Sequence, residues 1–209
     1  MTAVLLRLIV AQISIHACMT GMRMATPLLA LREGYSPAAV GVLLALFALT
    51  QVFLSLPAGR YADKHGLKRP LAISVIVAST GAATAVVFPI YPVLCFAALC
   101  SGGASGAAII ALQRHVGRQA HDKVALRKVF SWLAIGPAVS NFLGPIAACL
   151  LIDYAGGEAA STTGFRAAFV LLTLLPLSAW LWVRTVQEEK PELAPEGAKK
   201  TTAWDMLQN

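Results

Sequence analysis

Two long apolar runs of this chain are separated by the charged stretch Gly59-Arg60-Tyr61-Ala62-Asp63-Lys64-His65-Gly66-Leu67-Lys68-Arg69. The chain around this stretch is unusually apolar: 57% of its 209 residues are hydrophobic, 13% are charged, and the mean hydropathy is +0.70. An ordinary soluble domain has roughly 45–50% apolar and about 25% charged residues. We therefore expect lipid, and not water, to surround most of the chain.

Six runs reach the roughly 20 apolar residues that a helix needs to cross the hydrocarbon core of a bilayer. We place them at Val4–Ala30, Pro37–Ala58, Pro70–Phe88, Tyr91–Leu112, Val129–Ile152 and Phe165–Val186. A closed β-barrel also satisfies its backbone in lipid, but its strands alternate apolar and polar residues, and these runs are continuously apolar. The sequence predicts an all-α membrane protein with six transmembrane helices.

Lysine and arginine are distributed unevenly between the two sides of the predicted bundle. If the amino terminus lies inside, the inner segments hold most of the 17 basic residues, many of them in two longer inner loops at Gly59–Arg69 and Gln113–Lys128. Positive charge collects on the cytoplasmic side of membrane proteins, so we expect a multi-pass protein of the inner (plasma) membrane with both termini cytoplasmic. The net charge of +7 then reflects topology, and no nucleic-acid partner is expected.

The composition changes sharply after Val186. The following residues are largely charged or proline, and they contain too few apolar side chains to form a core. The sequence therefore predicts two parts, a six-helix transmembrane bundle over residues 1–186 and a cytoplasmic linker over residues 187–209.

A weak internal echo relates the two halves of the predicted bundle. Asp63, Gly66 and Arg69 are matched by Asp153, by Gly156 and, after an insertion, by Arg166. In the predicted topology the two copies lie on opposite sides of the membrane. This is the arrangement that an inverted repeat of three plus three helices produces.

The charged stretch resembles the signature loop between the second and third spans of the major facilitator superfamily of secondary transporters. Its pattern of glycines, acid and cations is carried by Gly59, Asp63, Lys64, Gly66, Lys68 and Arg69. The resemblance implies that Asp63 pairs at the inner face and helps to close the transporter on the cytoplasmic side. The alternative is that Lys64, Lys68 and Arg69 only fix the topology.

A second resemblance concerns the fifth predicted span. Its pairs Gly136-Pro137 and Gly144-Pro145 are similar to the Gly-Pro motif of the drug-antiporter branches, although Ala147 and Ala148 stand where that motif closes with two glycines. Proline removes a backbone hydrogen bond and bends a helix, while small residues allow close helix contact. The alternative is a packing kink without a role in transport.

Arg23 is the one clearly charged residue inside a predicted span, and such charges tend to face a cavity or a partner. Helical geometry puts Gln12, His16 and Arg23 on one polar stripe of the first helix. We expect Arg23 to line a substrate cavity, with an ion pair or snorkelling to the outer interface as alternatives. His16 is a candidate proton relay or a packing histidine. Asn141 is a candidate ligand contact or an interhelical hydrogen bond.

Enzymatic, metal and cofactor sites are not indicated, because no metal-ligand cluster, phosphate loop or paired nucleophile and base occurs at a meaningful spacing. We expect the amino-terminal half of a major-facilitator transporter that moves a small organic solute by alternating access, as efflux or antiport, truncated before its second half. The alternatives are an importer of an anionic metabolite and a non-transporting membrane remnant or scaffold. The expected partners are the lipid bilayer, a small-molecule substrate and a second six-helix half, missing or supplied by another chain.

Overall fold

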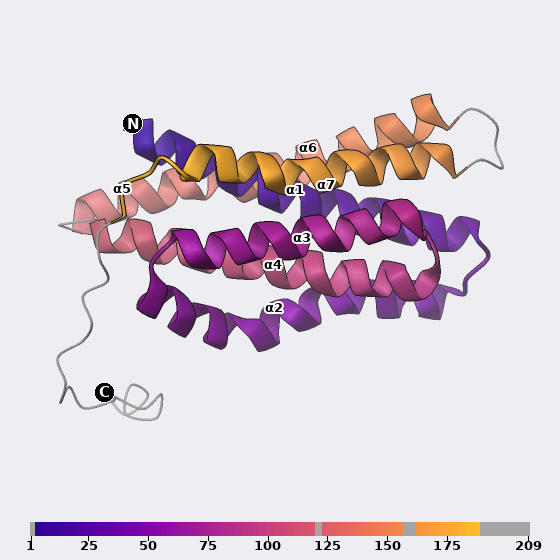
Figure 1. Ribbon diagram of the computed structural model, residues 1–209, viewed down its shortest axis with the longest axis horizontal. Helices are drawn as coiled ribbons and strands as arrows, with labels where there is room; N and C mark the ends of the chain where they lie inside the picture. The colour runs from indigo at the N-terminus through magenta and orange to yellow at the C-terminus, as the bar shows by residue number, and fades with distance from the viewer. Residues whose placement is uncertain (1–2, 120–122, 157–161, 189–209) are drawn as a thin grey trace.

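The computed structural model describes residues 3–119, 123–156 and 162–188, and within these ranges the chain forms seven helices and no strand. They are α1 (Ala3–Arg32), α2 (Pro37–His65), α3 (Lys68–Val87), α4 (Tyr91–Gln119), α5 (Lys123–Leu133), α6 (Ile135–Ala155) and α7 (Thr163–Val183). The long helices run side by side along the length of the molecule, with α1, α6 and α7 on one side and α2, α3 and α4 on the other (Figure 1).

Six spans of the described chain are long and apolar enough to cross a membrane. Five of them are the single helices α1, α2, α3, α4 and α7, and the sixth, Leu126–Ala155, joins most of α5 to α6. This confirms the predicted all-α membrane fold with six transmembrane helices. The chain is a multi-pass membrane protein, with the lipid bilayer as its solvent.

The two loops that the sequence predicts on the inner side are shorter than expected. The helix α2 continues through the charged stretch to His65, and only Gly66 and Leu67 separate it from α3. Charge alone does not end a helix, whereas Gly66 does, because its φ of +75° is open to glycine and strained for other residues. The predicted loop at Gln113–Lys128 is wrong in the same way, since α4 runs to Gln119 and α5 begins at Lys123.

The turn between α1 and α2, which the sequence predicts on the outer side, is as short as its turn residues suggest. The side chain of Ser36 accepts a hydrogen bond from the backbone N–H of Ala39 at 3.3 Å, and Pro37 occupies the first position of α2. A serine cap followed by proline is a strong helix start, because the cap satisfies a free N–H and proline has none to satisfy.

The helices pack as two inverted sets of three, α1 to α3 and α4 to α7, with α5 and α6 counted as one span. The helix α1 packs closely on α6 and α7, and α4 makes the equivalent contacts with α2 and α3. The last helices of the two sets, α3 and α7, are equivalent to each other and pack against each other. This exchange of equivalent contacts confirms the predicted inverted repeat.

Glycines allow the closest of these contacts. A Cβ atom at Gly102 of α4 would lie 2.4 Å from the carbonyl oxygen of Phe47 of α2, and one at Gly106 would lie 3.2 Å from the side chain of Gln51. Spans that associate in lipid gain from such close backbone approach, because apolar burial gives them little driving force. The face of α4 that carries Gly102 and Gly106 therefore packs against α2.

Burial differs strongly between the spans. In the most apolar stretch of α1, 61% of residues are buried inside the bundle, against 11% for α2 and 22% for the α5–α6 span. The helix α1 is thus central, while α2 and α6 present broad apolar faces to their surroundings. Phe53 of α2 and Phe142 of α6 are 71% and 65% exposed.

Candidate functional site

A cavity of about 300 Å³ lies between α1, α2 and α6. Its lining includes two of the predicted site residues, Arg23 from α1 and Asn141 from α6, whose side chains are exposed. The rest of its lining is Thr20, Met24, Leu44 and Pro145. Among the described residues, Arg23 makes no ion pair, so its guanidinium is available to a ligand.

Two prolines each leave a carbonyl of a cavity residue without its usual helical hydrogen bond. Pro27 follows Arg23 by four residues, and Pro145 follows Asn141 by four residues. Because proline has no N–H, neither the Arg23 carbonyl nor the Asn141 carbonyl receives the usual hydrogen bond from the next helical turn. The residues that line the cavity therefore carry a cation, an amide and backbone oxygens that lack this helical partner.

The other two predicted cavity residues lie elsewhere. The side chains of Gln12 and His16 are buried, at 2% and 8% exposure, and neither lines the cavity of Arg23. Gln12 packs on Gly136 of α6, where an added Cβ would lie 2.9 Å from the Gln12 side-chain amide carbon. Within the described part of the chain, Gln12 Oε1 and His16 Nδ1 have no hydrogen-bond partner. The predicted stripe thus divides into a buried part and an open part.

The helices that carry Arg23 and Asn141 are fastened together by hydroxyl groups. The hydroxyl of Ser140 donates to the carbonyls of Gly136 and Ile13, at 2.7 and 3.2 Å, and the hydroxyl of Thr20 donates to the Ser140 carbonyl at 2.8 Å. A Cβ atom at Gly144 would lie 2.5 Å from the carbonyl oxygen of Ala17. The seam between α1 and α6 fixes the relative position of the two polar cavity residues.

The two prolines of the predicted Gly-Pro motif, Pro137 and Pro145, act differently. Pro137 is the third residue of α6, so it cannot donate to the carbonyl of Leu133, and the chain divides there into α5 and α6 with Ala134 between them. The fifth predicted span, Val129–Ile152, is therefore two helical segments. Pro145 lies inside α6 at the cavity, and Gly136 and Gly144 are the points of contact with α1.

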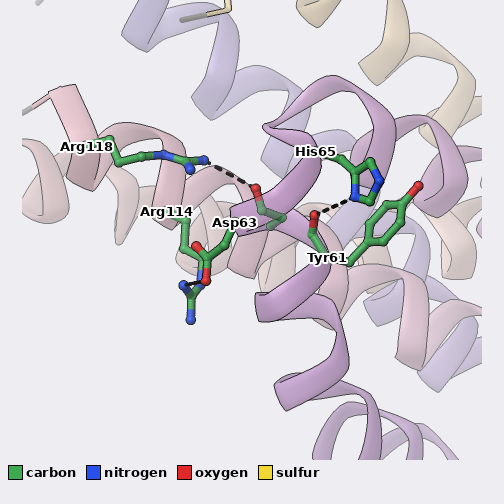
Figure 2. Close-up of polar contacts among 6 residues, drawn as sticks. Tyr61, Asp63, His65, Arg114 and Arg118 are labelled. Atoms are coloured by element: carbon green, nitrogen blue, oxygen red, sulfur yellow. Dashed lines mark hydrogen bonds and ion pairs between the residues drawn. The ribbon is translucent and has the colours of Figure 1, made fainter. Parts of the chain in front are cut away.

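The six residues that resemble the signature loop, Gly59, Asp63, Lys64, Gly66, Lys68 and Arg69, are called the gate motif after their predicted role. This motif contributes to an ion pair between α2 and α4. The carboxylate of Asp63 accepts a hydrogen bond from the guanidinium of Arg114 (Figure 2). Gly59 leaves room for that guanidinium, since a Cβ there would lie 3.0 Å from Arg114 Nη2. Arg118 also reaches α2, where it donates to the Ala62 carbonyl at 3.5 Å. Two cations of α4 therefore fasten the end of α2 that carries Asp63.

The turn between α2 and α3 is held by the segment that follows α7. The carboxylate of Glu188 accepts hydrogen bonds from the backbone N–H groups of Leu67 and Lys68, the latter at 3.0 Å. Lys68 Nζ donates to the Arg184 carbonyl at 3.1 Å. A carboxylate is well placed at the amino-terminal end of a helix such as α3, where free N–H groups and the helix dipole both favour negative charge.

The remaining cations of the gate motif, Lys64 and Arg69, have exposed side chains. The motif thus falls into three groups: Asp63 and Gly59 contact α4, Gly66 and Lys68 contact the segment after α7, and Lys64 and Arg69 face the surroundings. Arg114 and Glu188 were not singled out in the sequence. Their partners lie 51 and 121 residues away along the chain, so no local sequence pattern indicates these contacts.

Within the described residues, no three His, Cys, Asp or Glu side chains come together. Two groups of predicted site residues come together in the described chain, one at the cavity of Arg23 and Asn141 and one around Asp63 and Gly66. Six membrane spans in an inverted repeat around a partly polar cavity are the architecture of one half of a secondary transporter.

The sequence comparison agrees with this class. The sequence profile of the Major Facilitator Superfamily matches residues 8–207, and the chain belongs to this family. No curated protein sequence matches the chain significantly. Among solved structures, the in meso crystal structure of the POT family transporter PepTSo is similar, with a TM-score of 0.64 and 21% sequence identity. The likeness covers 91% of this chain and 39% of that transporter.

Proposed function

We propose that this chain supplies one half of a secondary transporter that moves a small organic solute across the inner membrane by alternating access. Membership of the Major Facilitator Superfamily supports transport as the activity. The observation that carries the proposal is the cavity that Arg23 and Asn141 share between α1 and α6.

The solute carries a carboxylate or a phosphate group. The guanidinium of Arg23 has a planar fork of donors that matches such oxygens with two parallel hydrogen bonds. In a cavity of low polarity an unpaired cation is costly, so an anionic solute gains more there than it would in water. The Asn141 amide and the neighbouring backbone carbonyls would then orient hydroxyl or amino groups of the same solute.

A second six-helix half completes the path, either in the same polypeptide or in another. The cavity lies beside α2 and α6, the two helices with the least buried surface, so a second bundle placed there would enclose it. The likeness covers 39% of the PepTSo chain, which supports the proposal that a second half completes the path. Rocking of the two bundles would expose the cavity to each side in turn.

The end of the bundle with Asp63 and Arg114 faces the cytoplasm and acts as the gate. The basic residues of α2, α3, α4 and α5 gather at this end, as expected for a cytoplasmic surface. In this arrangement both termini lie in the cytoplasm, and so does the linker predicted over residues 187–209, of which 189–209 lie outside the described residues. Breaking and forming contacts around Asp63 would accompany the change between the two states.

The test uses the complete reading frame in membrane vesicles, with labelled small carboxylates and sugar phosphates as probes. We expect Arg23→Gln to lower transport of the accepted anion at least about tenfold, since a hydrogen-bonded charge is worth about 1.5–3 kcal/mol, and Arg23→Lys to keep part of the activity. Arg166→Gln, which removes an exposed arginine from the first turn of α7 and outside the cavity lining, is the matched control.

The outcomes separate the candidate functions. Loss of anion transport in Arg23→Gln, with a normal amount of protein in the membrane, supports an anion transporter. Unchanged kinetics in Arg23→Gln would remove Arg23 from the substrate site. Absence of transport of every probe by the wild-type protein would favour the alternative of a membrane scaffold. Running each assay with and without a pH gradient reports whether transport is coupled to protons.

A further inference from the structure

A second cavity, of about 330 Å³, lies on the outer surface of the bundle between α2, α3 and α4. It is apolar apart from one hydroxyl and one phenol, and its lining consists of Leu54, Pro57, Ala58, Tyr61, Pro70, Ile73, Ser74 and Ala107. Its small residues at 58, 74 and 107 leave the space, and the interior proline of α2 lets this helix curve away from α3 (Figure 1). Leu54 and Ile73 are 45% and 48% exposed, so the cavity opens toward lipid.

One polar group in this cavity has no partner. Ser74 is 2% exposed, and its hydroxyl makes no hydrogen bond with any described residue. Most serines and threonines inside these spans donate to a carbonyl of the preceding turn, as Ser101 does to Ala97 at 2.7 Å. A buried hydroxyl without a partner is unfavourable, so a ligand that offers an acceptor at this position gains a hydrogen bond.

Cations lie next to the cavity at its cytoplasmic end. Lys64 follows Tyr61 by three residues on α2, and Arg69 precedes Ile73 by four residues on α3, so both share the helix faces that line the cavity. Their side chains are exposed. His65, stacked on Tyr61 with ring centroids 4.1 Å apart, lies on the same side of α2.

Acidic groups near this surface are turned to other partners. Asp63 projects from the opposite side of α2, toward Arg114, as Figure 2 shows. Glu188 accepts hydrogen bonds from the backbone of Leu67 and Lys68 at the turn. The face formed by Lys64, His65 and Arg69 therefore has a net positive charge directly beside an apolar cavity.

We propose that this cavity, with the face formed by Lys64, His65 and Arg69, binds one anionic phospholipid of the cytoplasmic leaflet. The phosphate lies at Lys64 and Arg69, an ester carbonyl accepts from the Ser74 hydroxyl, and the first part of an acyl chain fills the apolar lining. The spacing fits, because Arg69 and Ser74 are five residues apart on α3, which is about 8 Å along the helix axis. This assigns a ligand to the two motif cations that contact neither α4 nor the segment after α7.

The test measures lipid retention by native mass spectrometry of the complete protein, purified in detergent and titrated with phosphatidylglycerol or phosphatidylcholine. We expect preferential retention of one phosphatidylglycerol molecule. The double variant Lys64→Ala/Arg69→Ala should weaken it roughly 25-fold, at about fivefold for each cation near a membrane surface. The control Lys123→Ala/Lys128→Ala removes two exposed cations of α5 and should leave retention unchanged.

A second pair of variants tests the cavity itself. Ser74→Leu fills it and should abolish retention of phosphatidylglycerol, whereas Ser55→Leu adds the same side chain to α2 outside this cavity and should not. The Lys64 and Arg69 variants keep the proposal testable should Ser74→Leu fail to fold, because exposed side chains contribute little to folding.

Three results would overturn the proposal. One is equal retention of phosphatidylglycerol by the wild type and by Lys64→Ala/Arg69→Ala. Another is equal retention of phosphatidylcholine, which would show that the headgroup charge is not recognised. The last is displacement of phosphatidylglycerol by inorganic phosphate at the same concentration, which would assign the cations to a free anion and leave the apolar cavity without a ligand.

Discussion

Asp63 and Arg114 form an ion pair whose side chains are 52% and 45% exposed, respectively. Pairs with this degree of contact with solvent contribute about 0–1 kcal/mol to folding, because screening and side-chain entropy offset most of the attraction. The pair therefore does little to hold the bundle together. In the proposed transporter we expect its main effect on the balance between states that differ by a comparably small free energy.

Replacement of this carboxylate gives a prediction at the scale of one residue. In the complete transporter, Asp63→Asn should lower the maximal transport rate roughly fivefold, since about 1 kcal/mol changes a two-state balance by that factor, while the substrate concentration at half-maximal rate stays within about twofold. Flux in reconstituted vesicles measures both quantities. Glu33→Gln, an exposed acid at the other end of the bundle, serves as the control; a normal rate in Asp63→Asn would contradict the gate role.

The sequence predicts a site residue where its side chain is unusual for its position, such as a charged residue inside a membrane span. Arg23 is a charge within a span, and the structure puts it beside Asn141 in one cavity. His16 and Gln12 share its helical stripe, but burial against α6 separates them from that cavity, and periodicity cannot show which neighbour covers a stripe. Arg114 and Glu188 were not predictable, because their roles arise only from tertiary contacts.

At the scale of elements, the seam between α1 and α6 depends on Gly144. An added methyl group there would lie 2.2 Å from Thr20 Oγ1 and 2.5 Å from the Ala17 carbonyl oxygen, so the two helices would have to separate. We expect Gly144→Ala to lower the free energy of unfolding by about 1–3 kcal/mol, as over-packing usually does. Denaturation of the purified protein in detergent, followed by circular dichroism, measures the change.

The substitution of glycine by alanine also raises helix propensity, so a second glycine without close neighbours serves as the control. Gly41 lies inside α2 with no atom within 4 Å of an added Cβ, so Gly41→Ala should leave stability unchanged or raise it by about 0.5–1 kcal/mol. Equal effects of the two substitutions would mean that close contact at Gly144 does not hold α1 and α6 together.

Hydropathy predicts which segments form membrane-spanning helices, but it does not predict where these helices end. Each predicted span corresponds to a helix or to the α5–α6 pair, because apolar length is a direct requirement of the bilayer. The predicted inner loops were too long, since charged residues continue a helix in the headgroup region until Gly66 ends it. The division at Ala134 follows from Pro137, whose missing N–H acts one turn before the proline.

For the whole molecule, the inverted repeat explains why burial is unequal. The helices α1 and α4 occupy equivalent central places and contact each other, while α2 and α6 are equivalent peripheral helices that touch α4 and α1. The weak echo between Asp63 and Asp153 is consistent with this relation, but the sequence carries too little of it to predict which helices pack together. That information lies in small residues such as Gly102 and Gly144, which set the close contacts.

The orientation of the whole bundle gives the last prediction. In a variant whose four cysteines are replaced by serine, Glu33→Cys should react with a membrane-impermeant maleimide in intact cells, and Lys64→Cys should react only after the membrane is opened, because the basic end stays in the cytoplasm. Lys123→Cys should behave like Lys64→Cys, since α3 and α4 cross the membrane once each between the two positions. Labelling of Lys64→Cys and Lys123→Cys from opposite sides would contradict the six-span topology, whereas reversal of all three would keep the topology and invert the protein.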